Sequence, residues 1–321
     1  MIVPGYRALK LIMTTISFCL RASALLLACS PAVAGDCSPP SILLNAFDSN
    51  FKIERDLRAE DIKVEVDRKQ AQILSFSLDT HPRQIVLMVD SSGSMEASPQ
   101  KSGWGITLPA AAYAVDAVPA SASLALVTFS DKLRRESSDF ENRKLVGGRV
   151  LDLAKRQPKG PTSLFDSIDQ VLVEFKELHF GDAIYLVTDG GDNKSRISLR
   201  KLEEELISRG VRVFVFLVMR GVSRTEEEMS GASQMDGFAE STGGDVVQIS
   251  SAEVAGNKRA QLDKLAPRIV GQVEAVYRLE LGLSEVERAA RVKLAFVYQD
   301  RRKNTRSIAY SHQVVPCPRK P

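Results

Sequence analysis

The stretch IVLMVDSSGSM, residues 85–95, carries the strongest indication of the fold. Five apolar residues run directly into an aspartate, which small and hydroxyl-bearing residues follow. A short, continuously apolar run of this kind is typical of a strand that is buried on both faces, as in a parallel sheet covered by helices. Asp90 then marks the end of the strand, and Gly93 gives the next loop backbone freedom.

Four further apolar runs have the length of strands, at 124–129, 183–188, 211–218 and 246–249. Apolar residues recur at helical spacing in the segments 164–175 and 199–207 between these runs, and in the segment 262–276 after the last of them. This alternation predicts an α/β fold with a doubly wound, mostly parallel sheet. We expect Thr162 or Ser163 to cap the first of these helices, and Ser198 and Gly210 to mark the ends of the second.

Sequence typical of β-strands flanks this unit on both sides. Residues 62–78 are expected to form a hairpin, and strand patterns return at 277–283, 292–298 and 308–314. The simplest arrangement pairs them in a small β accessory region built from both chain ends. The predicted domains are a signal peptide (1–34), an N-terminal β segment (35–82), the α/β domain (83–252), and a C-terminal helix with strands that pack on the N-terminal segment (253–321).

The first 34 residues are interpreted as an export signal. Basic residues precede an apolar stretch, and Ala32-Val33-Ala34 offers a cleavage site, so we expect an exported, periplasmic or secreted protein. Met13 is an alternative start. An uncleaved anchor over residues 11–29, or lipid attachment at Cys29, stays open as the only route to membrane association.

Cleavage after Ala34 would leave two of the four cysteines, Cys37 and Cys317. In an oxidising compartment such a pair suggests a disulfide, which here would close nearly the whole mature chain. The alternatives are two free thiols, or a bond from Cys37 to another chain.

The charge of the mature chain excludes one class of function. The segment removed holds three basic residues and no acidic one, so the 43 Lys and Arg fall to 40, which equals the number of Asp and Glu. A nucleic-acid-binding protein would be expected to carry a basic surplus that displaces counterions from phosphates. We therefore expect no nucleic-acid partner.

Oxygen-bearing side chains follow two of the predicted strands and precede a predicted helix. Asp90, Ser92 and Ser94 are alternate residues of one loop, Thr162 precedes the helix, and Asp189 follows the strand 183–188. Ligands of doubly wound sheets bind at the carboxyl ends of the strands, so these loops should meet. Carboxylate and hydroxyl oxygens favour a hard cation, Mg²⁺ or else Mn²⁺ or Ca²⁺, over zinc.

The set Asp90-x-Ser92-x-Ser94, Thr162 in a Gly-x-Thr turn and Asp189 in TDG resembles the complete metal-ion-dependent adhesion site (MIDAS) of von Willebrand factor A domains. The resemblance implies that the three hydroxyls bind the ion, and that the two aspartates bind it directly or through water. A sixth position would then take an acidic group from a protein partner. The lead-in to the strand also resembles an exported bacterial subgroup; Pro161 departs from the usual small residue without removing a ligand.

The sequence fits the known enzyme classes that share these features poorly. We therefore expect no catalytic residues, no organic cofactor and no small-molecule substrate. A haloacid-dehalogenase-type phosphatase needs a second carboxylate where Ser92 stands. A serine hydrolase would need a G-x-S-x-G turn, which is missing, and the histidines lie in unrelated segments. The match of Ser198-Leu-Arg-Lys201 to S-x-x-K is explained by a helix cap and a solvated lysine.

Two questions stay open. The protein could be a periplasmic scaffold or assembly protein in which the metal is structural or unused. The partner is unidentified; Trp104, the only tryptophan, lies near the metal loop and could belong either to a contact surface or to the core.

Overall fold

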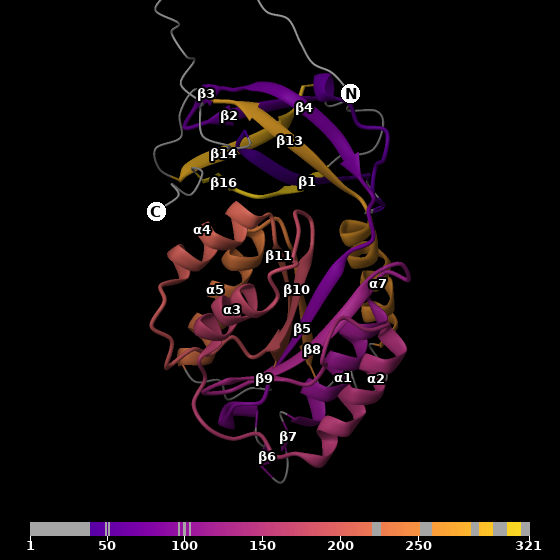
Figure 1. Ribbon diagram of the computed structural model, residues 1–321, viewed down its shortest axis with the longest axis vertical. Coiled ribbons are helices and arrows are strands. Elements are labelled where there is room, and N and C mark those ends of the chain that lie inside the picture. The colour runs from indigo at the N-terminus through magenta and orange to yellow at the C-terminus, as the bar shows by residue number, and fades with distance from the viewer. Residues whose placement is uncertain are drawn as a thin grey trace, which may run out of the picture. The chain divides into compact units, whose positions relative to one another are not determined.

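The computed structural model describes residues 39–315 except 49, 51, 96, 99–100, 103, 220–225, 251–258, 284–288 and 298–306. Within this part the chain forms a six-stranded sheet, two four-stranded sheets and a two-stranded ribbon of β6 (Ala97–Ser98) and β7 (Lys101–Ser102) (Figure 1). The predicted signal peptide and both cysteines of the predicted disulfide, Cys37 and Cys317, lie outside the described residues.

The six-stranded sheet has the order β12-β11-β10-β5-β8-β9, and all neighbours are parallel apart from β8 and β9. Its strands are β5 (Gln84–Asp90), β8 (Ser123–Phe129), β9 (Leu133–Arg135), β10 (Ala183–Thr188), β11 (Arg212–Met219) and β12 (Val246–Ser250). All six residues of β10 are buried, as expected for a strand with helices on both faces. The five predicted strands are confirmed to within one residue at each end, and β9 is too short and polar to be foreseen.

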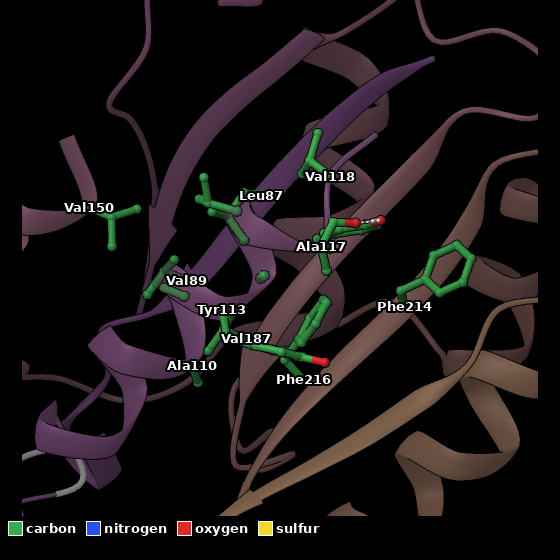
Figure 2. Packing of buried hydrophobic residues seen from close by; sticks show 14 of the residues in the cluster. Leu87, Val89, Ala110, Tyr113, Ala117, Val118, Val150, Val187, Phe214 and Phe216 are labelled. Carbon is green, nitrogen blue, oxygen red and sulfur yellow. Dashed lines mark hydrogen bonds between the residues drawn. The ribbon is translucent and has the colours of Figure 1, made fainter. Parts of the chain in front are cut away.

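Helices cover both faces of this sheet (Figure 1). One face carries α1 (Trp104–Asp116), α2 (Arg143–Asp152) and α7 (Arg259–Glu274); the other carries α3 (Leu164–Glu174), α4 (Leu199–Arg209) and α5 (Glu226–Ser241). Figure 2 shows the core under α1, where the Tyr113 ring meets Phe216 edge to face at 6.0 Å between centroids. The buried Tyr185 hydroxyl donates to the carbonyl of Ala117 at 3.0 Å. The α/β fold is thus confirmed.

The three predicted helices are present, whereas α1, α2 and α5 were not predicted. Helix α1 is rich in alanine, and most of its residues are buried, so it lacks a polar face that would reveal its period. Helix α2 contains Gly147 and Gly148, and α5 contains Gly231 and Gly237. Glycine disfavours helices, so tertiary packing rather than propensity holds these segments in helical form.

The β accessory region is a sandwich of two antiparallel sheets, β15-β1-β13-β4 and β16-β14-β2-β3. Its strands are β1 (Ser41–Phe47), β2 (Ile62–Val66), β3 (Lys69–Gln70), β4 (Gln72–Asp79), β13 (Val276–Gly282), β14 (Ala290–Phe296), β15 (Ser307–Tyr310) and β16 (Gln313–Val314). Both chain ends contribute: β1 lies between β13 and β15, and β2 pairs with β14. Apolar side chains from both sheets form one shared core.

The expected hairpin over residues 62–78 is wrong in its second half. Strand β2 pairs with the two-residue β3, and the turn between them places Asp67 and Arg68 at positive φ. Strand β4 then crosses to the other sheet and pairs with β13. The alternation of residues 72–78 predicted a strand correctly but held no information about its partner.

Helix α7 was predicted to pack on the N-terminal β segment, but it lies mainly against the six-stranded sheet. Leu262, Ile269 and Val273 belong to the core of the α/β domain, and the Tyr113 hydroxyl donates to the carbonyl of Leu262 at 2.6 Å. The C-terminal end of α7 contacts the N-terminal segment, where the Asn45 amide donates to the carbonyl of Gln272 at 3.2 Å. The helix therefore packs mainly on the six-stranded sheet.

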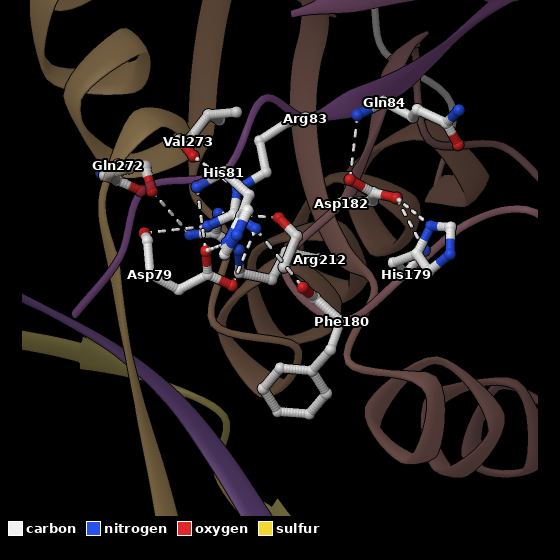
Figure 3. A network of polar contacts seen from close by, with 11 residues as sticks. Asp79, His81, Arg83, Gln84, His179, Phe180, Asp182, Arg212, Gln272 and Val273 are labelled. Carbon is white, nitrogen blue, oxygen red and sulfur yellow. Dashed lines mark hydrogen bonds and ion pairs between the residues drawn. The ribbon is translucent and has the colours of Figure 1, made fainter. Parts of the chain in front are cut away.

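Two buried arginines link the sandwich to the α/β domain (Figure 3). Arg212, at the start of β11, donates from Nη1 to Asn45 Oδ1 at 3.0 Å and to the carbonyl of Gln272 at 2.9 Å. Arg83 donates to the carboxylate of Asp79 at 3.1 Å and to its carbonyl at 2.9 Å. Burial, assisted by the charge of Arg83, lowers the pKa of Arg212 to about 9.

The described part of the chain contains no helix with both the length and the apolar character required to span a membrane.

Candidate metal centre

The order of the strands places the candidate ligands at one edge of the sheet. Strand β5 lies between β8 and β10, and Val89 is in register with Val187 of β10. Asp90 ends β5 and Asp189 directly follows β10, so both aspartates lie at the carboxyl ends of neighbouring parallel strands. The connection after β5 leads to α1 on one face and that after β10 leads to α4 on the other, which makes this the topological switch point.

The first loop is held by its own polar groups. The backbone N–H of Ser92 donates to Asp90 Oδ1 at 2.9 Å, and the hydroxyls of Ser92 and Ser94 lie 3.0 Å apart. Residues Gly93–Met95 form a single 3-10 turn, with the Met95 side chain wholly buried beneath it. The loop therefore brings the carboxylate of Asp90 and the hydroxyls of Ser92 and Ser94 together.

The second loop, before α3, is joined to the first through the backbone. The N–H of Gly93 donates to the carbonyl of Gly160 at 2.8 Å, and that of Lys159 donates to the carbonyl of Ser91 at 2.9 Å. A Cβ at position 93 would lie 3.2 Å from the carbonyl oxygen of Gly160, so the close approach favours glycine there. Thr162, only 3% exposed, comes two residues after Gly160 and is thereby held close to the Asp90 loop.

The third loop, after β10, completes the set. Thr188 Oγ1 donates to Asp90 Oδ2 at 2.7 Å, and the N–H of Gly191 donates to Asp189 Oδ1 at 3.2 Å. Asn193 exchanges hydrogen bonds with Thr162: its side-chain oxygen accepts from the Thr162 N–H at 3.0 Å, and its own N–H donates to the Thr162 carbonyl at 3.1 Å. Hydrogen bonds thus link all three loops that carry the five predicted ligands.

Sequence reasoning missed the residues that hold these loops together. Thr188 and Asn193 flank Asp189 in TDGGDN, but their roles depend on the register of β10 against β5. Ser163 is the N-cap residue of α3, which is one of the two positions expected, but its side chain makes no capping hydrogen bond. The first N–H groups of the helix instead donate to Asp192 Oδ1 and Ser195 Oγ, both at 3.0 Å.

The electrostatics of the site are those of two buried carboxylates. Asp90 is completely buried and Asp189 is 4% exposed. Burial, and secondarily the charge of Asp189, raises the pKa of Asp90 to about 7, although hydrogen bonds from Ser92 and Thr188 oppose the rise. The groups that donate to Asp90 are neutral, so they do not balance its charge.

The donor set fits a hard divalent cation. It consists of two carboxylates and three hydroxyls, and oxygen donors of this kind suit Mg²⁺, Mn²⁺ or Ca²⁺. Among the described residues, no group of three or more His, Cys, Asp or Glu side chains is arranged to hold a metal ion, so a cation at this site would depend on hydroxyl oxygens as well as on the two carboxylates. Asp90, Ser92, Ser94, Thr162 and Asp189 are the residues that would hold the ion.

Two residues singled out in the sequence have structural roles. Trp104 begins α1 and is 9% exposed in the core of the α/β domain, so packing accounts for it. The Ser198 hydroxyl accepts from the N–H of Lys201 at 3.4 Å at the start of α4. The S-x-x-K match is thus a helix cap.

The sheet order defines a doubly wound α/β domain whose candidate metal centre lies at the topological switch point. A model of the von Willebrand factor type A domain matches residues 84–251, more than half of the chain. The chain therefore belongs to the von Willebrand factor A domain family. No curated protein sequence matches it.

Solved structures resemble the chain at low identity. Proximal thread matrix protein 1 of the mussel byssus shares 18% identity at a TM-score of 0.45, over 65% of this chain and 50% of that protein, so the chain spans about half its length. Another structure of that protein, with a zinc-occupied MIDAS motif, gives 17% and 0.45 over the same shares. Manganese-loaded TRAP protein of Plasmodium vivax gives 14% and 0.41 over 76% and 99%. A von Willebrand factor type A protein of Catenulispora acidiphila gives 13% and 0.46 over 87% and 75%.

Proposed function

We propose that this chain is an exported von Willebrand A-domain protein that holds one divalent cation at a complete MIDAS and uses the cation to bind an acidic group of a protein partner. The observation that carries the proposal is the pair of buried carboxylates, Asp90 and Asp189, at the ends of neighbouring strands. Burying charged carboxylates without a counter-charge is costly. A bound cation would remove that cost and would offer a coordination position to an oxygen of the partner.

Each of the five residues has a separate part in this proposal. Ser92, Ser94 and Thr162 supply neutral hydroxyl oxygens, so the two aspartates carry all of the negative charge. Hydrogen bonds from Thr188 and from the Ser92 N–H orient the Asp90 carboxylate. A divalent ion balanced only by Asp90 and Asp189 keeps its attraction for a further carboxylate.

Binding rather than catalysis is supported by what surrounds the site. Ser92 occupies the position where a phosphatase of similar fold would need a second carboxylate. His81 and His179 precede β5 and β10, at the amino end of the sheet, and His312 belongs to the sandwich region. None of these three imidazoles is placed to act as a base at the carboxyl edge.

The metal part of the proposal is tested by calorimetry and thermal unfolding of protein first stripped with EDTA. We expect Mg²⁺ or Mn²⁺ to bind at one site per chain and to raise Tm. The Asp90→Asn variant should lose both effects, whereas Asp139→Asn, an exposed carboxylate between β9 and α2, should retain them. Equal Tm shifts in Asp90→Asn and wild type would refute metal binding at this site.

The partner part needs a separate probe. Two peptides of glycine and serine, one with a central aspartate and one with asparagine instead, are titrated against the Mg²⁺-loaded protein and followed by NMR. We expect only the aspartate peptide to bind, and only with metal present. Metal binding with no preference for aspartate would favour the alternative, a scaffold protein whose metal is structural.

The proposal includes export and a disulfide between Cys37 and Cys317. Expression of the full chain with its N-terminal segment should yield a mature protein that begins at Gly35, as measured by intact mass. Thiol titration of the unfolded, unreduced protein should then find no free thiol. Two free thiols per chain would exclude the disulfide and leave the metal site unaffected.

A further inference from the structure

Three exposed lysines lie on loops that border the candidate metal centre, each on a different loop. Lys132 lies in the turn after β8, Lys159 in the loop before α3, and Lys194 in the loop after β10. The hydrogen bonds that join these loops bring the three lysines to the carboxyl edge of the sheet. We call Lys132, Lys159 and Lys194 the basic rim.

The backbones of the rim residues are tied to the residues that carry the proposed ligands. The N–H of Lys159 donates to the carbonyl of Ser91 at 2.9 Å, and that of Lys194 donates to the carbonyl of Thr162 at 3.1 Å. The turn that holds Lys132 is joined to α3, since the N–H of Ser163 donates to the carbonyl of Ser130 at 2.7 Å. The rim therefore keeps a fixed position around the centre, while its side chains reach into solvent.

Acidic side chains on the same loops do not cancel this charge. The segments 130–132, 159–163 and 190–196 contain four basic residues, the rim and Arg196, against two acidic ones, Asp131 and Asp192. Asp192 already accepts hydrogen bonds from the Leu164 N–H and the Ser195 hydroxyl.

The remaining acid, Asp131, offsets the rim only weakly. Its carboxylate lies 3.8 Å from Lys194 Nζ, and both side chains are about half exposed. Exposed pairs of this kind contribute little. The rim therefore keeps most of its positive charge for a partner.

We propose that the partner of this site presents its coordinating acid within a cluster of further acidic residues, and that the basic rim binds those flanking acids. The inference rests on the proposed function, because the rim can reach the flanking acids only when an acid of the partner is bound at the cation. Charge complementarity around a binding site increases both the association rate and the selectivity for the partner. Three exposed ion pairs together correspond to roughly a tenfold gain in affinity.

The test uses two synthetic heptapeptides with one central aspartate, measured by calorimetry against the Mg²⁺-loaded full chain. The first peptide flanks the aspartate with glycine and serine, and the second flanks it with four glutamates. We expect the second to bind about tenfold more tightly at low salt, with the difference shrinking as ionic strength rises. The triple variant Lys132→Gln/Lys159→Gln/Lys194→Gln should bind both peptides alike and keep its Mg²⁺-induced Tm shift.

Two matched variants serve as controls. Lys69→Gln/Lys176→Gln/Lys293→Gln removes the same charge from exposed lysines outside the rim and should retain the tenfold preference. Asp131→Asn removes the weak ion pair with Lys194 and should leave the preference unchanged or raise it slightly.

Each other outcome has a distinct meaning. If both peptides bind wild type equally in Mg²⁺, the basic rim has no selective role and only this inference fails. If neither binds, the proposed function fails with it. A preference that survives in the rim variant would also overturn the inference.

Discussion

Helix α5 and the loop that carries Asp189 meet at two glycines, and replacing one of them gives the most direct test of how the site is supported. Gly190, at φ +87°, faces Gly231 of α5. A Cβ at position 231 would lie 2.3 Å from the carbonyl oxygen of Gly190 and 2.7 Å from its carbonyl carbon. Both atoms belong to the backbone, so a side-chain rotation cannot relieve the clash in Gly231→Ala.

The size of the effect follows from this distance. Ordinary contacts of a Cβ begin at about 3.4 Å, so the helix or the loop must move by roughly 1 Å. Overpacking of this kind costs about 1–3 kcal/mol of unfolding free energy. Asp189 is the residue next to Gly190, and disturbed support of a ligand typically lowers metal affinity by about 10–100-fold.

Gly237 of the same helix provides the matched control, because its added Cβ would meet nothing within 4 Å. It is exposed in α5, so Gly237→Ala should stabilise the protein by about 0.5–1 kcal/mol through helix propensity alone. Urea unfolding gives the stabilities, and calorimetry with Mg²⁺ gives the affinities. If Gly231→Ala matches Gly237→Ala in both measurements, the close packing of α5 on the Asp189 loop does not support the site.

Three further substitutions test other contacts. Thr188→Val removes the donor to Asp90 Oδ2 and the acceptor of the Gly190 N–H, so it should cost about 1–3 kcal/mol in urea unfolding and weaken Mg²⁺ binding in calorimetry. Arg212→Met leaves the buried carbonyls and Asn45 Oδ1 without this donor, and should cost about 2–4 kcal/mol; a neutral effect would show that relief from burying the cation offsets the lost bonds. Burial raises the pKa of Glu203 above 4.5, against the Ser241 hydrogen bond, so its contribution to stability is present below pH 4.5 and is lost as pH rises through the folded pKa. In urea unfolding across pH 4–8, Glu203→Gln should flatten this decline; an unchanged pH profile would exclude Glu203 as its source.

The parts of the fold that could be predicted are those in which burial leaves a simple pattern. Strands such as β5 and β10 are buried on both faces, so a short apolar run identifies them. Helices α3 and α4 each bury one face, which gives a clear helical period. Helix α1 is buried on most sides and has no such period.

The strand pairing and the hydrogen bonds that hold the candidate ligands could not be predicted, for a different reason. The alternation in β4 indicates a strand, but its partner β13 is supplied by a segment about two hundred residues further along. In the candidate site, the residue types of Asp90, Thr162 and Asp189 are visible in the sequence. The hydrogen bond from Thr188 to Asp90 exists only because β5 and β10 are neighbours in register, and strand order is a property of the whole fold.

The sandwich built from both chain ends has a consequence for the order of folding. Strand β1 pairs with β13, with Leu44 opposite Tyr277, so it gains this partner strand only after the α/β segment between them has been synthesised. At about 5–20 residues per second, this wait lasts roughly 10–50 s. During that time the α/β unit can close around contacts that are mostly nearer in sequence, which form faster. Until then the apolar side chains of β1 lack the neighbouring strand beside which they are buried, and a chain truncated before β13 would lack it permanently.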